Sequence, residues 1–85
     1  MGNYIKIIGN KDRIISDFIE KQKKYWFHTK DLFTGIRTIH YKNSTDLKEQ
    51  IEDLVFYLKD NKLDFAQDSN GIKLLSERLE IYNVE

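Results

Sequence analysis

Apolar residues recur along two stretches of the chain with the spacing of an amphipathic helix. In residues 11–24 the apolar side chains fall within one helical stripe, formed by Ile14, Ile15, Phe18 and Ile19. In residues 45–61 they recur at i, i+4, i+7, i+8 and i+11, at Leu47, Ile51, Leu54, Val55 and Leu58. These patterns predict two helices, each with one face towards a core.

Both predicted helices are preceded by residues that favour helix starts. Asn10 lies just before the first helix, and asparagine is a good N-cap. Residues 43–46, Asn-Ser-Thr-Asp, offer several caps for the second helix, and Glu49 follows Asp46 at capping-box spacing.

Strand patterns fill most of the remaining chain. Residues 4–8, 25–30 and 36–42 are rich in β-branched and aromatic side chains, and 63–67 resembles a short strand. Residues 31–35 contain Gly35 and suit a hairpin loop, and Asn70-Gly71 predicts a tight turn. Residues 72–84 fit either a helix or a returning strand, and we favour the strand because it follows that turn.

The resulting order is β-α-β-β-α-β with a further C-terminal strand or helix. This order predicts an α+β fold, a ferredoxin-like sandwich in which two helices cover one face of a largely antiparallel sheet. With 85 residues, we expect one domain spanning 1–85.

Composition narrows the class of protein. The chain has no Cys, which excludes disulfides and thiolate metal sites, and its longest apolar runs are too short for a transmembrane helix. We therefore expect a cytoplasmic protein without membrane contact. Many Lys, Ile and Asn residues, with a single Ala and no Pro, fit an AT-rich coding sequence such as that of a low-GC bacterium or a phage.

The formal net charge of zero is the sum of two opposite halves. Residues 1–42 hold nine basic and four acidic side chains, giving +5, whereas residues 43–85 hold five basic and ten acidic ones, giving −5. Such asymmetry bears on partners and association rather than on fold. It leaves a homodimer, with opposite charges facing each other, as an open alternative.

A run of lysines near residue 21 suggests phosphate contacts. On a helix, however, acidic residues lie four positions before two of these lysines, in the pairs Asp17–Lys21 and Glu20–Lys24. We therefore expect a largely self-paired, solvated face that leaves Lys23 without a partner.

The hairpin of residues 25–42 offers a candidate nucleic-acid surface. If Lys30 pairs with Ile36, Tyr25, Phe27, Ile39 and Tyr41 share the core face. The outer face then collects Trp26, His28, Lys30, Thr38, His40 and Lys42, which together with Lys23 could stack bases and meet phosphates. A shift of register by one residue would undo this grouping. His28 and His40 lack further ligands for a metal site, and we expect no metal.

The second predicted helix carries acidic residues opposite its apolar stripe. Around Phe56, with Tyr57 at the edge, this face presents Glu49, Glu52, Asp53 and Asp60. Such an arrangement is typical of an aromatic anchor with a charged rim at a protein interface. Alternatively, residues 72–84 cover Phe56.

Catalytic and cofactor motifs are missing from the sequence. There is no glycine-rich phosphate loop. Among possible enzymes, the sequence gives most support to a hydrolase that uses His28 and His40, with Asp31 orienting His28. We therefore expect no enzyme activity and no cofactor. The leading hypothesis is a small protein-binding modulator or inhibitor, of the immunity or anti-defence type in bacteria and phages, whose partner has a basic surface. Nucleic-acid binding by the hairpin is the alternative.

Overall fold

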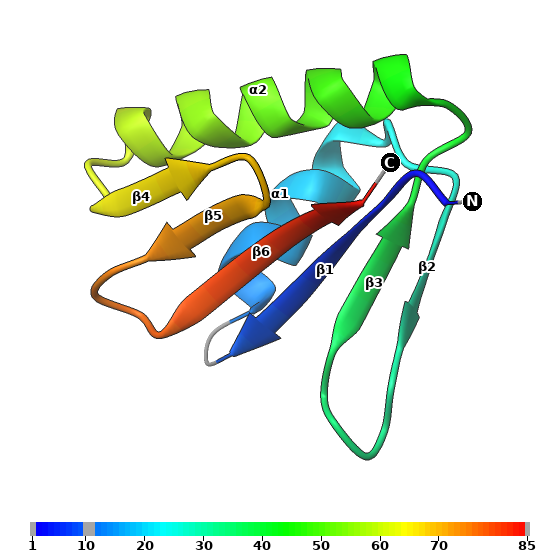
Figure 1. Ribbon diagram of the computed structural model, residues 1–85, viewed down its shortest axis with the longest axis horizontal. Coiled ribbons are helices and arrows are strands. Elements are labelled where there is room, and N and C mark those ends of the chain that lie inside the picture. The colour runs from blue at the N-terminus through cyan, green and yellow to red at the C-terminus, as the bar shows by residue number, and fades with distance from the viewer. Residues whose placement is uncertain (1, 10–11, 85) are drawn as a thin grey trace.

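Strand β1 (Tyr4–Gly9) shows how the sequence pattern becomes a two-layer structure. Ile5 and Ile7 are fully buried against the helices, whereas Lys6 between them points to the opposite, exposed face. In the computed structural model, which describes residues 2–9 and 12–84, six strands form one antiparallel sheet and two helices cover one of its faces (Figure 1). The elements after β1 are α1 (Arg13–Gln22), β2 (Phe27–Lys30), β3 (Arg37–His40), α2 (Ser44–Asp60), β4 (Phe65–Asp68), β5 (Gly71–Leu74) and β6 (Leu79–Val84).

The predicted α+β class is confirmed, but the ferredoxin-like order is not. The strands lie in the order β2-β3-β1-β6-β5-β4, so the strand that follows α2 lies at an edge of the sheet. A meander through β5 then brings β6 beside β1. The chain therefore has one strand more than the sequence pattern predicted.

The C-terminal segment accounts for this extra strand. Residues 72–84 are strand rather than helix, as favoured, but a turn at residues 75–78 divides them into β5 and β6. Arg78 takes a left-handed conformation (φ 47°) in this turn, which ends the extended run.

The predicted register of the β2–β3 hairpin is wrong by one residue. Lys30 lies opposite Arg37 rather than Ile36, and His28 lies opposite Ile39. The carboxylate of Asp31 accepts the backbone N–H groups of Phe33 (2.8 Å) and Thr34 (3.1 Å), and the Asp31 N–H donates to the carbonyl of Ile36 (2.9 Å). Asp31 and Ile36 therefore close a loop of residues 32–35, one residue shorter than predicted.

The helices begin and end close to the predicted positions. Of the candidates in residues 43–46, Asn43 caps α2, because its side chain accepts the N–H of Asp46 at 2.8 Å. Asp46 lies within the first turn of α2, so the capping box expected at Asp46 and Glu49 is wrong. Asn10, the predicted cap of the first helix, lies outside the described residues. Asp12 precedes α1, and its carboxylate pairs with Arg37 (2.5 Å) rather than with the helix N-terminus.

Aliphatic side chains from both layers form the core. They include Ile15 and Ile19 of α1, and Leu54 and Leu58 of α2, all with no exposed surface. Ile51 and Val55, predicted for the same stripe, are only partly buried. Instead Gln50 is fully buried, where its amide accepts the Tyr41 hydroxyl (3.0 Å) and donates to the Gln22 side chain (2.7 Å).

The two charge halves of the sequence also divide the sheet. The basic half contributes β2, β3 and β1, and the acidic half contributes β6, β5 and β4. In the part of the chain that the structure describes, no helix is long and apolar enough to cross a membrane.

Candidate binding surfaces

The outer side of α2 forms the first candidate surface. Phe56 is 72% exposed and Glu49, Glu52 and Asp60 are exposed beside it, while Asp53 and Tyr57 are partly buried. Residues 72–84, the alternative cover for Phe56, contribute to β5 and β6 of the sheet instead (Figure 1). We call these six residues of α2 the acidic helix face.

One carboxylate of this face is already paired, contrary to the sequence-based expectation. Lys24 was predicted to pair with Glu20, but its ammonium group contacts Asp53 at 2.5 Å. Lys23 takes a left-handed conformation (φ 56°), so Lys24 lies outside α1 and cannot reach Glu20 by helical spacing. The hydrogen bond to Asp53 raises the pKa of Lys24, and the charge of Glu49 raises it further.

A shallow cleft between α1 and α2 accompanies the exposed phenylalanine. The ring of Tyr57 stacks on Phe18 of α1, with centroids 4.2 Å apart and planes 25° apart. The cleft encloses about 240 Å³ and is lined by Phe18, Gln22, Asp53, Phe56, Tyr57 and Asp60. It therefore combines aromatic walls with a carboxylate rim, which suits a cation that carries an apolar stem.

The second candidate surface is the face of the sheet that no helix covers. On the β2-β3-β1 half, the rings of Phe27 and His40 stack with centroids 4.2 Å apart and planes 11° apart. Tyr4 continues the row at 5.5 Å from His40, and Trp26 meets Phe27 edge-on at 5.0 Å. We call these four residues the aromatic sheet cluster.

The corrected register divides the residues predicted for nucleic-acid binding. Trp26 (60% exposed) and His40 belong to the aromatic sheet cluster, and Thr38 shares the uncovered face. His28 and Lys30 face the helix side, where His28 Nε2 lies 3.7 Å from a carboxylate oxygen of Glu20.

Among the other side chains predicted for the hairpin, one changes its face and two keep theirs. Phe27, predicted for the core, is 40% exposed on the uncovered face, whereas Ile39 and Tyr41 are buried as predicted. Lys23 and Lys42 are exposed outside the strands, one after α1 and one between β3 and α2.

The same register separates the two histidines. His28 and His40 lie on opposite faces of the sheet, so they cannot act together on one substrate or hold one metal ion. The Asp31 carboxylate, proposed to orient His28, binds backbone N–H groups of its own turn, which lowers the pKa of Asp31. Among the described residues, no group of three or more His, Asp and Glu side chains could hold a metal ion.

A polar hollow adjoins the aromatic sheet cluster. It encloses about 370 Å³ and is lined by Lys6, Thr29, Lys30, Asp31, Thr34, Ile36 and Thr38. The Lys6 ammonium also lies 5.8 Å from the centroid of the Tyr4 ring. Lys6 and three hydroxyls are thus available next to the rings, whereas the side chain of Lys30 faces the helix side.

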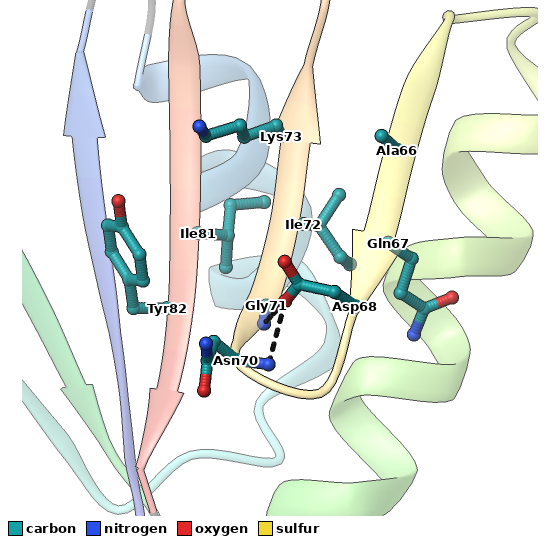
Figure 2. Close-up of a pocket in the computed structure, with 9 residues that line it drawn as sticks. All are labelled: Ala66, Gln67, Asp68, Asn70, Gly71, Ile72, Lys73, Ile81 and Tyr82. Atoms are coloured by element: carbon teal, nitrogen blue, oxygen red, sulfur yellow. Dashed lines mark hydrogen bonds between the residues drawn. The ribbon is translucent and has the colours of Figure 1, made fainter.

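A further hollow lies on the acidic half of the uncovered face, and Figure 2 shows its lining. It encloses about 330 Å³ above Gly71 and Ala66, and its rim includes Tyr82, Lys73 and Asp68. These rim groups already have partners. Tyr82 donates to Glu80, which raises the pKa of Tyr82, and Lys73 lies 3.7 Å from Glu80.

Asp68 of this rim supports the turn between β4 and β5. Its carboxylate accepts the N–H groups of Asn70 (2.7 Å) and Gly71 (3.1 Å), drawn as dashed lines in Figure 2. The two-residue turn is therefore Ser69–Asn70, and Gly71, predicted for the turn, is the first residue of β5.

Sequence reasoning missed three large apolar side chains that the structure leaves exposed. Leu32 (93% exposed) and Phe33 (100% exposed) form the tip of the β2–β3 hairpin, and Phe27 stacks on the uncovered face. The sequence signal available for the hairpin tip was an apolar pair inside an otherwise polar loop. No sequence signal identified Phe27, because the face of the sheet on which it lies depends on the strand register.

Comparisons of the chain with protein-family models, with curated proteins and with solved structures give no match.

Proposed function

We propose that this protein acts by binding another protein through the acidic helix face, as a small modulator or inhibitor without catalytic chemistry of its own. The observation that carries the proposal is Phe56, a large apolar side chain that is 72% exposed between carboxylates. Exposed aromatic side chains surrounded by polar residues are frequent anchors of protein interfaces. Immunity and anti-defence proteins of bacteria and phages are the class of modulator that this surface and the AT-rich composition favour.

The cleft between the helices indicates the chemistry of the partner. A guanidinium group placed over Phe56 or Tyr57 gains a cation–π contact, and Asp60 at the rim offers a carboxylate for bidentate hydrogen bonding. Arginine suits this cleft better than lysine, because its planar group stacks on rings and binds carboxylates at the same time. The partner therefore presents an arginine from a basic surface.

A short arginine-containing peptide, its lysine analogue and its neutral citrulline analogue provide the test. We expect titration with the arginine peptide to shift backbone amide resonances around Phe56 and Asp60, and added salt to weaken binding. Phe56→Ala should lower the affinity about 2- to 5-fold, the size of an exposed cation–π contact.

Leu75→Ala is the matched control, because Leu75 is also an exposed apolar residue (66%) but lies in the turn before β6. We expect this variant to bind the arginine peptide like the wild type. Equal affinity for the citrulline peptide, or unchanged binding by Phe56→Ala, would rule out the cleft as the binding site.

The alternative function is nucleic-acid binding by the hairpin. His28 and Lys30, which were predicted to take part, face the helix side of the sheet and are not available for it. The aromatic sheet cluster still favours nucleic-acid binding, but through residues that differ in part from those predicted.

A further inference from the structure

The uncovered face of the β2-β3-β1 half of the sheet carries chemistry that the proposed function does not use. Lys6 and Thr29 are exposed there and Thr38 is partly exposed, next to the aromatic sheet cluster. The acidic helix face belongs to the other layer of the molecule (Figure 1). We propose that this half of the uncovered sheet face binds single-stranded nucleic acid.

The arrangement of the rings is the first observation that carries this proposal. Phe27, His40 and Tyr4 form a row across β2, β3 and β1, and Trp26, just before β2, adjoins Phe27, with neighbouring centroids 4.2–5.5 Å apart. Bases stack on aromatic side chains irrespective of sequence, because every base has a π-face. Trp26 and Phe27, 60% and 40% exposed, have ring surface available for such stacking.

One cation and two hydroxyls next to the row supply contacts for a phosphate backbone. Lys6 lies beside Tyr4 and lines the polar hollow together with Thr29 and Thr38, which share the uncovered face. Asp31 also lines this hollow, but its carboxylate is occupied by the N–H groups of Phe33 and Thr34. Lysine contacts to phosphates provide the larger part of affinity that is independent of sequence.

The charges of the sheet limit the surface to one half. On the uncovered face, β1 contributes the cation Lys6 and neither β2 nor β3 contributes a carboxylate, whereas β6 and β4 contribute Glu80 and Asp68, with Lys73 between them on β5. A nucleic-acid strand is attracted to Lys6 and repelled by these two carboxylates. The aromatic sheet cluster lies within the attractive half.

Stacking distinguishes single strands from duplexes. The faces of the bases in a duplex are covered by their neighbours, whereas the bases of a single strand can splay out onto side-chain rings. A row of rings on a sheet therefore favours single strands.

Fluorescence anisotropy of labelled oligo-dT and oligo-U, each about ten nucleotides long, tests the proposal at low salt. The two oligonucleotides distinguish DNA from RNA as the source of the strand. We expect wild-type protein to bind at least one of them and to bind a duplex of the same length more weakly. Phe27→Ala and Trp26→Ala should each lower affinity between about 5-fold and 100-fold, the range measured for stacked bases.

Lys6→Ala tests the phosphate contact. It should weaken binding to every oligonucleotide and reduce the slope of log affinity against log salt by about 0.7, the value for one contact to a single strand. Lys73→Ala is the matched control, because Lys73 is exposed on the acidic half of the same face. We expect this control to bind like the wild type, and circular dichroism to show that all variants are folded.

Three results would overturn the proposal. The first is no binding of either oligonucleotide at low salt, and the second is equal affinity for the duplex. The third is a wild-type dimer in sedimentation that Phe27→Ala dissociates, because the face would then be an interface between two copies of this chain. None of these results affects the arginine-peptide test of the acidic helix face.

Discussion

Gly71 and Gly35 both occupy backbone positions that favour glycine, but for different reasons. A Cβ atom at Gly71 would lie 1.9 Å from the carbonyl oxygen of Ile81 in the neighbouring strand. Gly35 takes a left-handed conformation (φ 73°), yet a Cβ atom there would meet nothing within 4 Å. Gly71 thus lacks space for a side chain and also has a positive φ (158°), whereas Gly35 depends on backbone conformation alone.

We therefore expect Gly71→Ala to lower the free energy of unfolding by roughly 2–4 kcal/mol, because β5 and β6 must separate to admit the methyl group. Gly35→Ala, the matched control, should cost only about 1–2 kcal/mol, the penalty for a left-handed residue with a side chain. Urea denaturation of both variants measures the difference. Equal costs at the two positions would contradict the close approach of β5 to β6.

The sequence-based predictions of the candidate surfaces were right for some side chains and wrong for others, depending on whether the signal was local. The Phe56 side chain was assigned to the outer face of α2 from helical spacing alone, because that spacing is local. Asp31 pairs with Ile36 and leaves a hairpin loop one residue shorter than composition suggested, and the resulting shift of register exchanged the faces of Phe27 and His28. An error of one residue thus changed the membership of a whole surface.

At the scale of elements, the end of α1 bears on both candidate surfaces. Lys23, just after α1, has φ 56°, and its N–H donates to the carbonyl of Ile19 at 3.2 Å. This left-handed geometry is the one in which glycine most often ends a helix. It turns the chain so that Lys24 reaches α2 and Trp26 reaches the sheet.

Lys23→Gly should raise the free energy of unfolding by about 0.5–1 kcal/mol, because glycine removes the strain of the left-handed conformation at a modest entropic cost. Lys21→Gly is the control. Lys21 lies within α1, where glycine should lower the free energy of unfolding by about 1 kcal/mol. Thermal unfolding monitored by circular dichroism reports both changes, and a destabilised Lys23→Gly variant would contradict this account of the helix end.

Elements with strong local patterns were predictable. Both helices and the first three strands were expected near their observed positions, because hydrophobic spacing and the Asn43 cap are local signals. The division of residues 72–84 was not expected, since the break depends on the conformation of Arg78 in a turn. The position of the strand after α2 at the sheet edge follows from long-range pairing, which local patterns do not encode.

At the scale of the whole molecule, a buried polar junction joins the two layers. Tyr41, which follows β3, donates its hydroxyl to Gln50 of α2, and Gln50 donates to Gln22 of α1. Burial raises the pKa of the Tyr41 phenol well above its usual value. The junction therefore requires the neutral phenol.

This junction predicts a loss of stability at alkaline pH. An exposed tyrosine in the unfolded chain ionises near pH 10, whereas Tyr41 in the folded chain keeps its proton to higher pH. The contribution of Tyr41 is therefore intact below about pH 10 and is lost as the pH rises further, by about 1.4 kcal/mol for each pH unit.

Urea denaturation of the wild type and of Tyr41→Phe, repeated from neutral pH to about pH 11, isolates this effect from that of other groups. We expect the difference in unfolding free energy between the two proteins to be constant below about pH 10 and to shrink above it. A constant difference across the whole range would show that Tyr41 ionises as freely in the folded chain as in the unfolded one.

The separation of charge was predictable from the sequence only in part. The +5 and −5 halves of the chain supply separate halves of the sheet, since β1, β2 and β3 come from the first and β4, β5 and β6 from the second, while α1 and α2 carry part of each charge in the other layer. The pairing of Lys24 with Asp53 was not predictable, since it joins residues 29 positions apart. It reduces the free negative charge of the acidic helix face.

The position of Trp26 makes the intrinsic fluorescence of the protein sensitive to ligands on the uncovered sheet face. Trp26 is the single tryptophan of the chain, and it lies in the aromatic sheet cluster rather than in the core. A nucleobase stacked on its indole would quench the emission, whereas an arginine held between α1 and α2 would leave it nearly unchanged. Unlabelled protein in a fluorimeter can therefore tell which of the two surfaces a newly isolated ligand occupies.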